Sequence, residues 1–554
     1  MADSQLNFDV YSHLLTFVSS PSDLLSFGLA NKDLFELAGP EIIYRSIRCK
    51  LSNNAVWEHL IANSAQASRV RELEIQRENP SGYGPLDERE RLPEGKNLDS
   101  SGLSSVDYAE VEKSERLLLS AIHKMVNLES FTWDRWVPVV NQGEEVQESR
   151  EVQPATYSED IWTALRDHAQ IKRLNVVDLG RSEVLLEGIR PIFESTIFTL
   201  GNLTHLDLKI IYSPLNENEG AEGVNNHNDD DDDEEELLPG RVRIERLQDL
   251  LSRCPNLETL SLAILDRSFY YDFDGNPFTN ISSILSSNPL PRLSSLKLQD
   301  ILIDDDVLAH FIVAHPNLRH FSAFLSIDGD SLPSSPFALE GYEDELIDIL
   351  PNLLTIDLPP EPLRIILRGL KRPSVIRELS VVEPCDWDAH EDGESEERVS
   401  SLDDVWGAPE ENLESPMEGT HRSQLKNLLI DMPGLQSIVV KDVVSLSQLD
   451  KLSKATPTVE SVTFRGPFIG HLANHPRPHA ELLPYIARWP RLKSLRGCHL
   501  FAGASVDFAS TDTLAAAKEI AQACPLVRSV SWHGQSVKLV QADDGEVTLE
   551  DKNA

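Results

Sequence analysis

One short unit recurs along the chain and constrains its fold more than any other feature. It consists of a helical stretch, a residue followed by proline, one further residue, and then the pattern Leu-x-x-Leu-x-apolar. The clearest copies begin at Cys254, His315, Leu350, Met432, Thr456, Trp489 and Cys524. Weaker copies begin at Val70, Leu128, Ile171, Leu203, Leu293 and Ile376. Adjacent copies mostly lie about 24 to 36 residues apart, which suits a strand–helix repeat.

The proline explains how each copy is divided. A helical pattern such as Ile244, Leu247 and Leu251 precedes it. The residue before proline is pushed out of the helical region, so the helix must stop there and an extended strand can follow. One unit cannot cover its own apolar face, but stacked copies bury a continuous core. We therefore predict an α/β fold with parallel strands on a concave face and helices outside.

This pattern resembles leucine-rich repeats of the long and irregular kind. The consensus asparagine ladder is missing, because its position after Leu257, Leu260 and Leu262 is taken by Leu265. Generic alternation of helices and strands would also place leucines after helices. The recurring proline favours the repeat interpretation.

The first fifty residues are rich in apolar side chains at helical spacing. We expect a first helix from about Asp9 to Val18. Ser20 and Pro21 predict the start of a second helix, because a capping hydroxyl followed by proline is typical of such starts. Asn31 can cap a third helix, which we expect to end at Gly39-Pro40.

A last turn is expected over residues 42–47. Helices this short cannot bury all of their apolar surface among themselves. Part of that surface must face the next domain or another protein. The residues alone leave two alternatives open, a docking motif and a subdomain that caps the following domain.

Several spaced features of this segment occur in the order of a known pattern. They are Leu6 to Leu15, Ser20-Pro21-Ser22-Asp23-Leu24-Leu25, Leu29-Ala30-Asn31-Lys32 and Leu37-Ala38. The segment resembles an F-box, from which it departs at Asn7, Tyr11 and Ala30-Asn31. In that family, the helices pack on a Skp-type adaptor, which links them to a cullin–RING ubiquitin ligase.

The resemblance also implies which residues would do this. By position, the adaptor contact would be made by Leu6, Phe8, Val10, Leu14, Leu15, Leu24, Leu25 and Leu29. The remaining apolar residues, Leu34, Phe35, Ile42 and Tyr44, would join the motif to the next domain.

The expected organisation has three parts. An F-box-like helical motif occupies residues 1–50, a leucine-rich-repeat-like solenoid residues 51–540, and a C-terminal tail residues 541–554. Polar insertions of low order are expected near 77–110, 136–158, 212–241 and 385–421. The third contains eight consecutive carboxylates, Asp229 to Glu236, which repel one another and cannot pack. A calcium site there would need a glycine-kinked ligand loop, which the run lacks.

Charge and cysteine content restrict the possible partners and the cellular compartment. The formal net charge of −41 argues against nucleic acid and against anionic membranes, since both require a basic face. The five cysteines are scattered without a CxxC pair, which fits a reducing compartment. The sequence shows no signal peptide and no apolar run long enough to span a membrane. We expect an intracellular protein, in the cytoplasm or nucleus.

Motifs for catalysis are missing from the sequence. We find no GxSxG, no GxxxxGK[ST] and no HExxH, so we expect no enzyme, no cofactor and no metal. His471, His475 and His479 could be metal ligands, but prolines between them favour a surface loop over residues 470–484. Trp133 and Trp136, or residues 269–271, could form either a recognition patch or part of the core.

Two functions fit these features. The first is a substrate-recognition subunit of a Skp–cullin–F-box-type ubiquitin ligase, whose repeats bind a protein substrate that the sequence does not identify. The second is a leucine-rich-repeat interaction scaffold unconnected with ubiquitin. In the second case, Leu14, Leu15, Leu24 and Leu25 should all be buried against the first repeats. In the first case, much of that surface should be exposed.

Overall fold

The structure is a computed structural model of the whole chain. It describes residues 8–18, 20–76, 108–135, 157–168, 170–179, 192, 195–212, 243–266, 278–325, 336–381, 432–441, 446–465, 478–497, 511–532, 535–541 and 547–551. The insertions expected from the sequence lie outside these ranges, except for residues 108–110, 157–158 and 212 at their ends.

The chain divides into two compact units, which are described separately. The first contains α1 (Phe8–Phe17), α2 (Pro21–Gly28), α3 (Lys32–Tyr44), β1 (Ser46–Lys50), α4 (Asn54–Ala62), α5 (Ser64–Ala67), β2 (Glu72–Gln76), α6 (Tyr108–Ile122), β3 (Ser130–Arg135), α7 (Tyr157–Asp167), β4 (Arg173–Leu179), η4 (Thr196–Thr199), β5 (His205–Tyr212), α8 (Ile244–Ser252) and β6 (Thr259–Asp266).

The later elements continue the same alternation. They are β7 (Thr279–Asn280), α9 (Ser282–Ser287), β8 (Ser295–Gln299), β9 (Ile301–Leu302), α10 (Asp305–Ala314), β10 (His320–Phe324), β11 (Thr355–Leu358), α11 (Pro360–Gly369), η7 (Pro373–Val375), β12 (Glu378–Val381), β13 (Ser437–Lys441), α15 (Leu446–Ala455), β14 (Ser461–Arg465), α16 (Pro478–Ile486), β15 (Ser494–Gly497), α17 (Thr511–Ala523), β16 (Ser529–Trp532), β17 (Gln535–Gln541) and β18 (Val547–Asp551).

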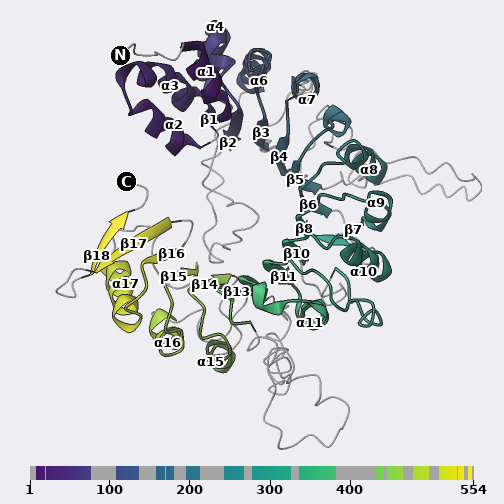
Figure 1. Cartoon of the computed structure of the whole chain (residues 1–554), viewed down its shortest axis with the longest axis vertical. Coiled ribbons are helices and arrows are strands. Elements are labelled where there is room, and N and C mark those ends of the chain that lie inside the picture. The colour runs from purple at the N-terminus through teal and green to yellow at the C-terminus, as the bar shows by residue number, and fades with distance from the viewer. Residues whose placement is uncertain are drawn as a thin grey trace, which may run out of the picture. The chain divides into compact units, whose positions relative to one another are not determined.

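Parallel strands in chain order dominate both units, which confirms the predicted α/β class. In the first unit β1 to β6 pair successively, and in the second β8, β10 and β11 to β16 do the same. In the first unit, α4 packs on α6, α6 on α7, α7 on η4 and η4 on α8. These helices follow one side of the strands (Figure 1).

The repeated motif sets the register of the sheet. The leucine position of each copy pairs with the same position of the next, and these side chains are at most 1 % exposed. In the first unit the row is Leu73, Phe131, Leu174, Leu206 and Leu260. In the second it is Leu296, Phe321, Ile356, Leu379, Ile438, Val462, Leu495 and Val530.

The proline of each strong copy lies in a tight turn. In Cys254-Pro255-Asn256-Leu257, the Leu257 N–H donates to the Cys254 carbonyl at 3.1 Å. Proline suits the second position of such a turn because its φ is already fixed near the required value. Cys254 and Leu257 are both fully buried, so the turn brings the helix end and the strand start into the same core.

Backbone carbonyls connect the starts of neighbouring strands. The Arg71 carbonyl accepts from the N–H groups of both Glu129 and Ser130, at 2.8 and 2.9 Å. The Glu129 carbonyl accepts in the same way from Lys172 and Arg173. The pattern continues through both units, so these backbone bonds hold the strand starts in register although the consensus asparagine ladder is missing.

Two details near the N-terminus differ from the prediction. The third helix does not end at Gly39-Pro40 but runs on to Tyr44. Proline clashes with the Cβ of the residue before it, and Gly39 has none, so the helix can pass through Pro40. Ile47 does not belong to a last helical turn, because it lies in β1 and pairs with Leu73. The sheet therefore begins before residue 50.

Other differences lie further along the chain. Residues 541–554 are not a simple tail, since β18 pairs antiparallel with β17. The expected loop over 470–484 is helical from Pro478, where proline suits a first helical position, whereas His471 and His475 lie outside the described residues. Trp133 is a core residue at 2 % exposure. Trp136 and residues 269–271 lie outside the described residues.

Candidate docking surface on the N-terminal helices

Local capping fixes the starts of the second and third helices as the sequence predicts. The Ser20 hydroxyl caps α2 by accepting from the Asp23 N–H at 3.4 Å, and Pro21 occupies the first helical position. The Asn31 side-chain oxygen caps α3 by accepting from the Leu34 N–H at 2.8 Å. These caps set where the chain turns between the helices.

The three helices share a small core of their own. It consists of the buried side chains of Leu15, Leu24, Leu37 and Ala38. Partly buried apolar side chains pack around it, namely Tyr11, Val18, Phe27 and Ile42. The Tyr11 and Phe27 rings meet edge to face with centroids 5.9 Å apart. The helices therefore hold together through contacts with one another.

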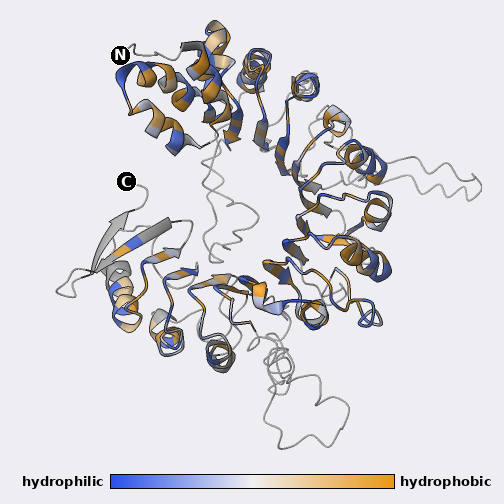
Figure 2. Cartoon of the chain, in the orientation of Figure 1, coloured by the Kyte–Doolittle hydropathy of each residue, from blue (hydrophilic) through white to orange (hydrophobic). Residues whose placement is uncertain are grey.

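The same helices leave large apolar side chains exposed. Eleven such side chains are exposed in the part of the chain that the structure describes, and seven of them lie within residues 10–43. The seven are Val10, Leu14, Phe17, Leu25, Leu29, Phe35 and Ile43. Figure 2 shows apolar positions, in orange, along all three helices. We call these seven side chains the outer apolar set.

The structure describes the side chains of six of the eight residues predicted to contact an adaptor. Val10, Leu14, Leu25 and Leu29 are exposed, with fractions between 42 % and 71 %. Leu15 and Leu24 are core residues and not surface residues, which corrects the prediction for these two. Phe8 begins α1, but its side chain and the whole of Leu6 lie outside the described residues.

The prediction missed some exposed residues and misplaced another. Phe17 is 71 % exposed and lies three residues after Leu14, which itself lies four residues after Val10, so this helical spacing could have identified it. Phe35 was expected to join the next domain but is half exposed. Tyr44 does make that connection, because its hydroxyl hydrogen bonds to His59 Nε2 at 3.1 Å and the two rings stack.

Polar contacts fasten this helical cluster to the first strands. The Arg45 guanidinium donates to the Val18 carbonyl, near the end of α1, at 2.5 Å. The Arg45 carbonyl accepts from the N–H groups of Arg71 and Glu72. Arg69 pairs with Glu41 of α3 at 2.7 Å. Arg45 thus joins α1 to β2, and burial is the main cause that lowers the pKa of its guanidinium.

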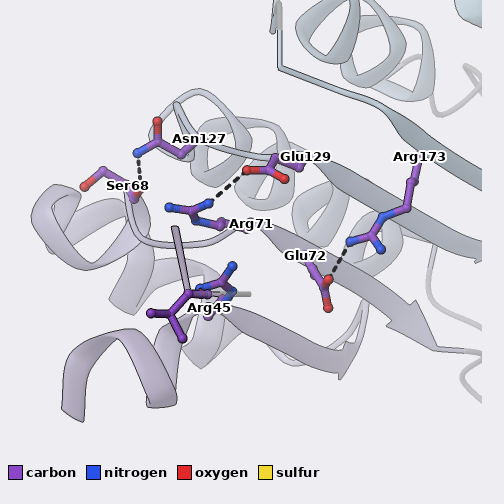
Figure 3. Close-up of polar contacts among 8 residues, drawn as sticks. Arg45, Ser68, Arg71, Glu72, Asn127, Glu129 and Arg173 are labelled. Carbon is purple, nitrogen blue, oxygen red and sulfur yellow. Dashed lines mark hydrogen bonds and ion pairs between the residues drawn. The ribbon is translucent and has the colours of Figure 1, made fainter. Parts of the chain in front are cut away.

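Neighbouring copies of the repeat are joined by further side-chain contacts (Figure 3). Arg71 pairs with Glu129 at 3.1 Å, and Arg173 pairs with Glu72 at 2.5 Å. The Asn127 side chain donates to the Ser68 carbonyl at 2.7 Å. These contacts surround Arg45, where the N-terminal helices attach. They hold the first copies of the repeat together at that point.

The described residues contain neither a candidate metal site nor a helix that could cross a membrane. They contain no group of three or more histidine, cysteine or acidic side chains able to hold a metal ion. Within the same residues, no helix has the length and apolar character required to cross a bilayer. The three cysteines described, Cys49, Cys254 and Cys524, are buried free thiols.

Comparisons with known proteins do not identify a family. No family model and no curated protein matches the chain. Among solved structures, one similar chain is that of "Crystal structure of TLR13-ssRNA13 complex", with 14 % sequence identity and a TM-score of 0.22. The match covers 61 % of this chain and 43 % of that one, so it spans less than half of the other chain's length.

Proposed function

We propose that this protein is a substrate-recognition subunit of a Skp–cullin–F-box-type ubiquitin ligase. The N-terminal helices would dock a Skp-type adaptor and through it a cullin. The leucine-rich-repeat solenoid formed by the helix–strand copies would bind a protein substrate. Such a subunit brings two partners together and performs no bond chemistry itself.

The observation that carries the proposal is the outer apolar set. Exposed apolar groups in contiguous patches mark interaction sites, whereas single exposed side chains are common on any protein. Seven within 34 residues, on helices that already have a core, are more than a cap requires. Their positions include four of the residues at which the F-box resemblance places the adaptor contact.

The repeats support a binding role by their form. Each copy adds one strand to a parallel sheet, and alternate residues of every strand point away from the buried leucine row. Repeat proteins use such extended surfaces to hold partners. We propose that the substrate binds this face, although no described residue identifies it chemically.

Co-purification with a Skp-type adaptor tests the proposal. The full chain should retain the adaptor, and the double variant Leu25→Ser/Leu29→Ser should retain at least about tenfold less, because buried apolar anchors dominate interface energies. Val313→Ser is the matched control, since Val313 is 50 % exposed but lies on α10. A truncated chain for this assay should lack residues 1–44 and keep β1, because β1 belongs to the sheet.

Two results would contradict the proposal. One is failure of the intact chain to retain the adaptor. The other is equal retention by the intact chain and by the Leu25→Ser/Leu29→Ser variant, with unchanged thermal melting of both proteins.

The alternative is a repeat scaffold unconnected with ubiquitin, whose N-terminal helices only cap the sheet. The contacts of Arg45, Tyr44 and Arg69 favour a capping role, because they attach the helices to α4 and to the start of β2. On that alternative, Leu14, Leu15, Leu24 and Leu25 should all be buried against the first repeats. Leu14 and Leu25 are more than 40 % exposed, and Leu15 and Leu24 are buried in the core that the helices share with one another.

A further inference from the structure

We draw no further inference here: the strongest candidate, the exposed apolar face of α3 at Phe35 and Ile43, belongs to the outer apolar set already described, and nothing in the structure shows a second partner that would cover it.

Discussion

Replacement of Glu115 by glutamine should stabilise the first unit, and increasingly so at higher pH. Glu115 lies on α6 and is only 5 % exposed. Its Oε2 atom is buried and has no hydrogen-bond partner. The nearby cation, Arg135 at the end of β3, already pairs at 3.5 Å with Asp178, its register partner on β4. Arg135 is therefore the positively charged neighbour of two buried carboxyl groups, those of Glu115 and Asp178.

Burial raises the pKa of Glu115 to about 7 from an ordinary 4.5, a rise that Arg135 reduces and Glu112 adds to. Burial also raises the pKa of Asp178, although Arg135 opposes the shift. The pKa of Glu115 is higher in the folded state than in the unfolded state. The protonated side chain therefore contributes its full stability below about pH 4.5. This contribution is lost as the pH rises through about 7.

The size of the effect follows from the difference between the folded-state pKa of Glu115, about 7, and its ordinary value of 4.5. One pKa unit corresponds to about 1.4 kcal/mol, so ionisation of Glu115 should destabilise the fold by about 3 kcal/mol at pH 8. Glutamine keeps the shape and cannot ionise. The advantage of Glu115→Gln over the natural protein should therefore grow by about 2 kcal/mol between pH 5.5 and pH 8.

Hydrogen exchange followed by mass spectrometry suits this measurement, because a chain of two units need not unfold in a single step. Peptides from α6, β3 and β4 should be better protected in Glu115→Gln, and the difference should widen at pH 8 after correction for intrinsic exchange. Glu110→Gln is the matched control, since Glu110 lies on the same helix and is 59 % exposed. A gap that stays constant with pH, or that is equal in the control, refutes the reasoning.

Three further predictions concern packing. Leu24→Ala should reduce the exchange protection of α1 to α3 by about 3 kcal/mol, because Leu24 is fully buried, whereas Leu29→Ala should change it by less than about 0.5 kcal/mol. Gly434→Ala should destabilise β12 and β13 by about 1 to 3 kcal/mol in the same assay, because a Cβ there would lie 2.4 Å from the Ser374 carbonyl oxygen. Burial raises the pKa of Cys524 to about 11, so iodoacetamide should label it at pH 8 only after denaturant unfolds the chain; rapid labelling of the folded protein would contradict the reasoning.

The repeat register was predictable because one pattern recurs. Each proline marks a helix end, and each leucine after it occupies the same row of the sheet. β1 was missed because its alternation at Ile47 and Cys49 directly follows a helical run that ends at Tyr44. The hairpin of β17 and β18 had a signal, since Asp544-Gly545 is a common hairpin turn flanked by alternating apolar residues. This signal was not used, and residues 541–554 were predicted to be a tail.

The side-chain orientations at the candidate site were not predictable to the same degree. Leu14 and Leu15 are consecutive, so they differ by about 100° around α1 and only one can face the core. Which one does depends on where α3 places Leu37 and Ala38, and that depends on contacts distant in sequence. The contacts of Arg246 and Arg253 with the backbone near η4 were not predictable for a similar reason. Ser195 caps this short helix, but four residues show too little periodicity to identify it from the sequence.

The proposed capping and docking roles of the N-terminal helices depend on different residues. A repeat array needs a cover at its end, because the last copy otherwise leaves its apolar face in water. Arg45 and Tyr44 fix the helices there, and Leu15 and Leu24 hold them together. None of these contacts requires an outward leucine or phenylalanine. A cap alone would be more soluble with polar residues at such positions, so the exposure of Phe17 and its neighbours supports the proposed docking role.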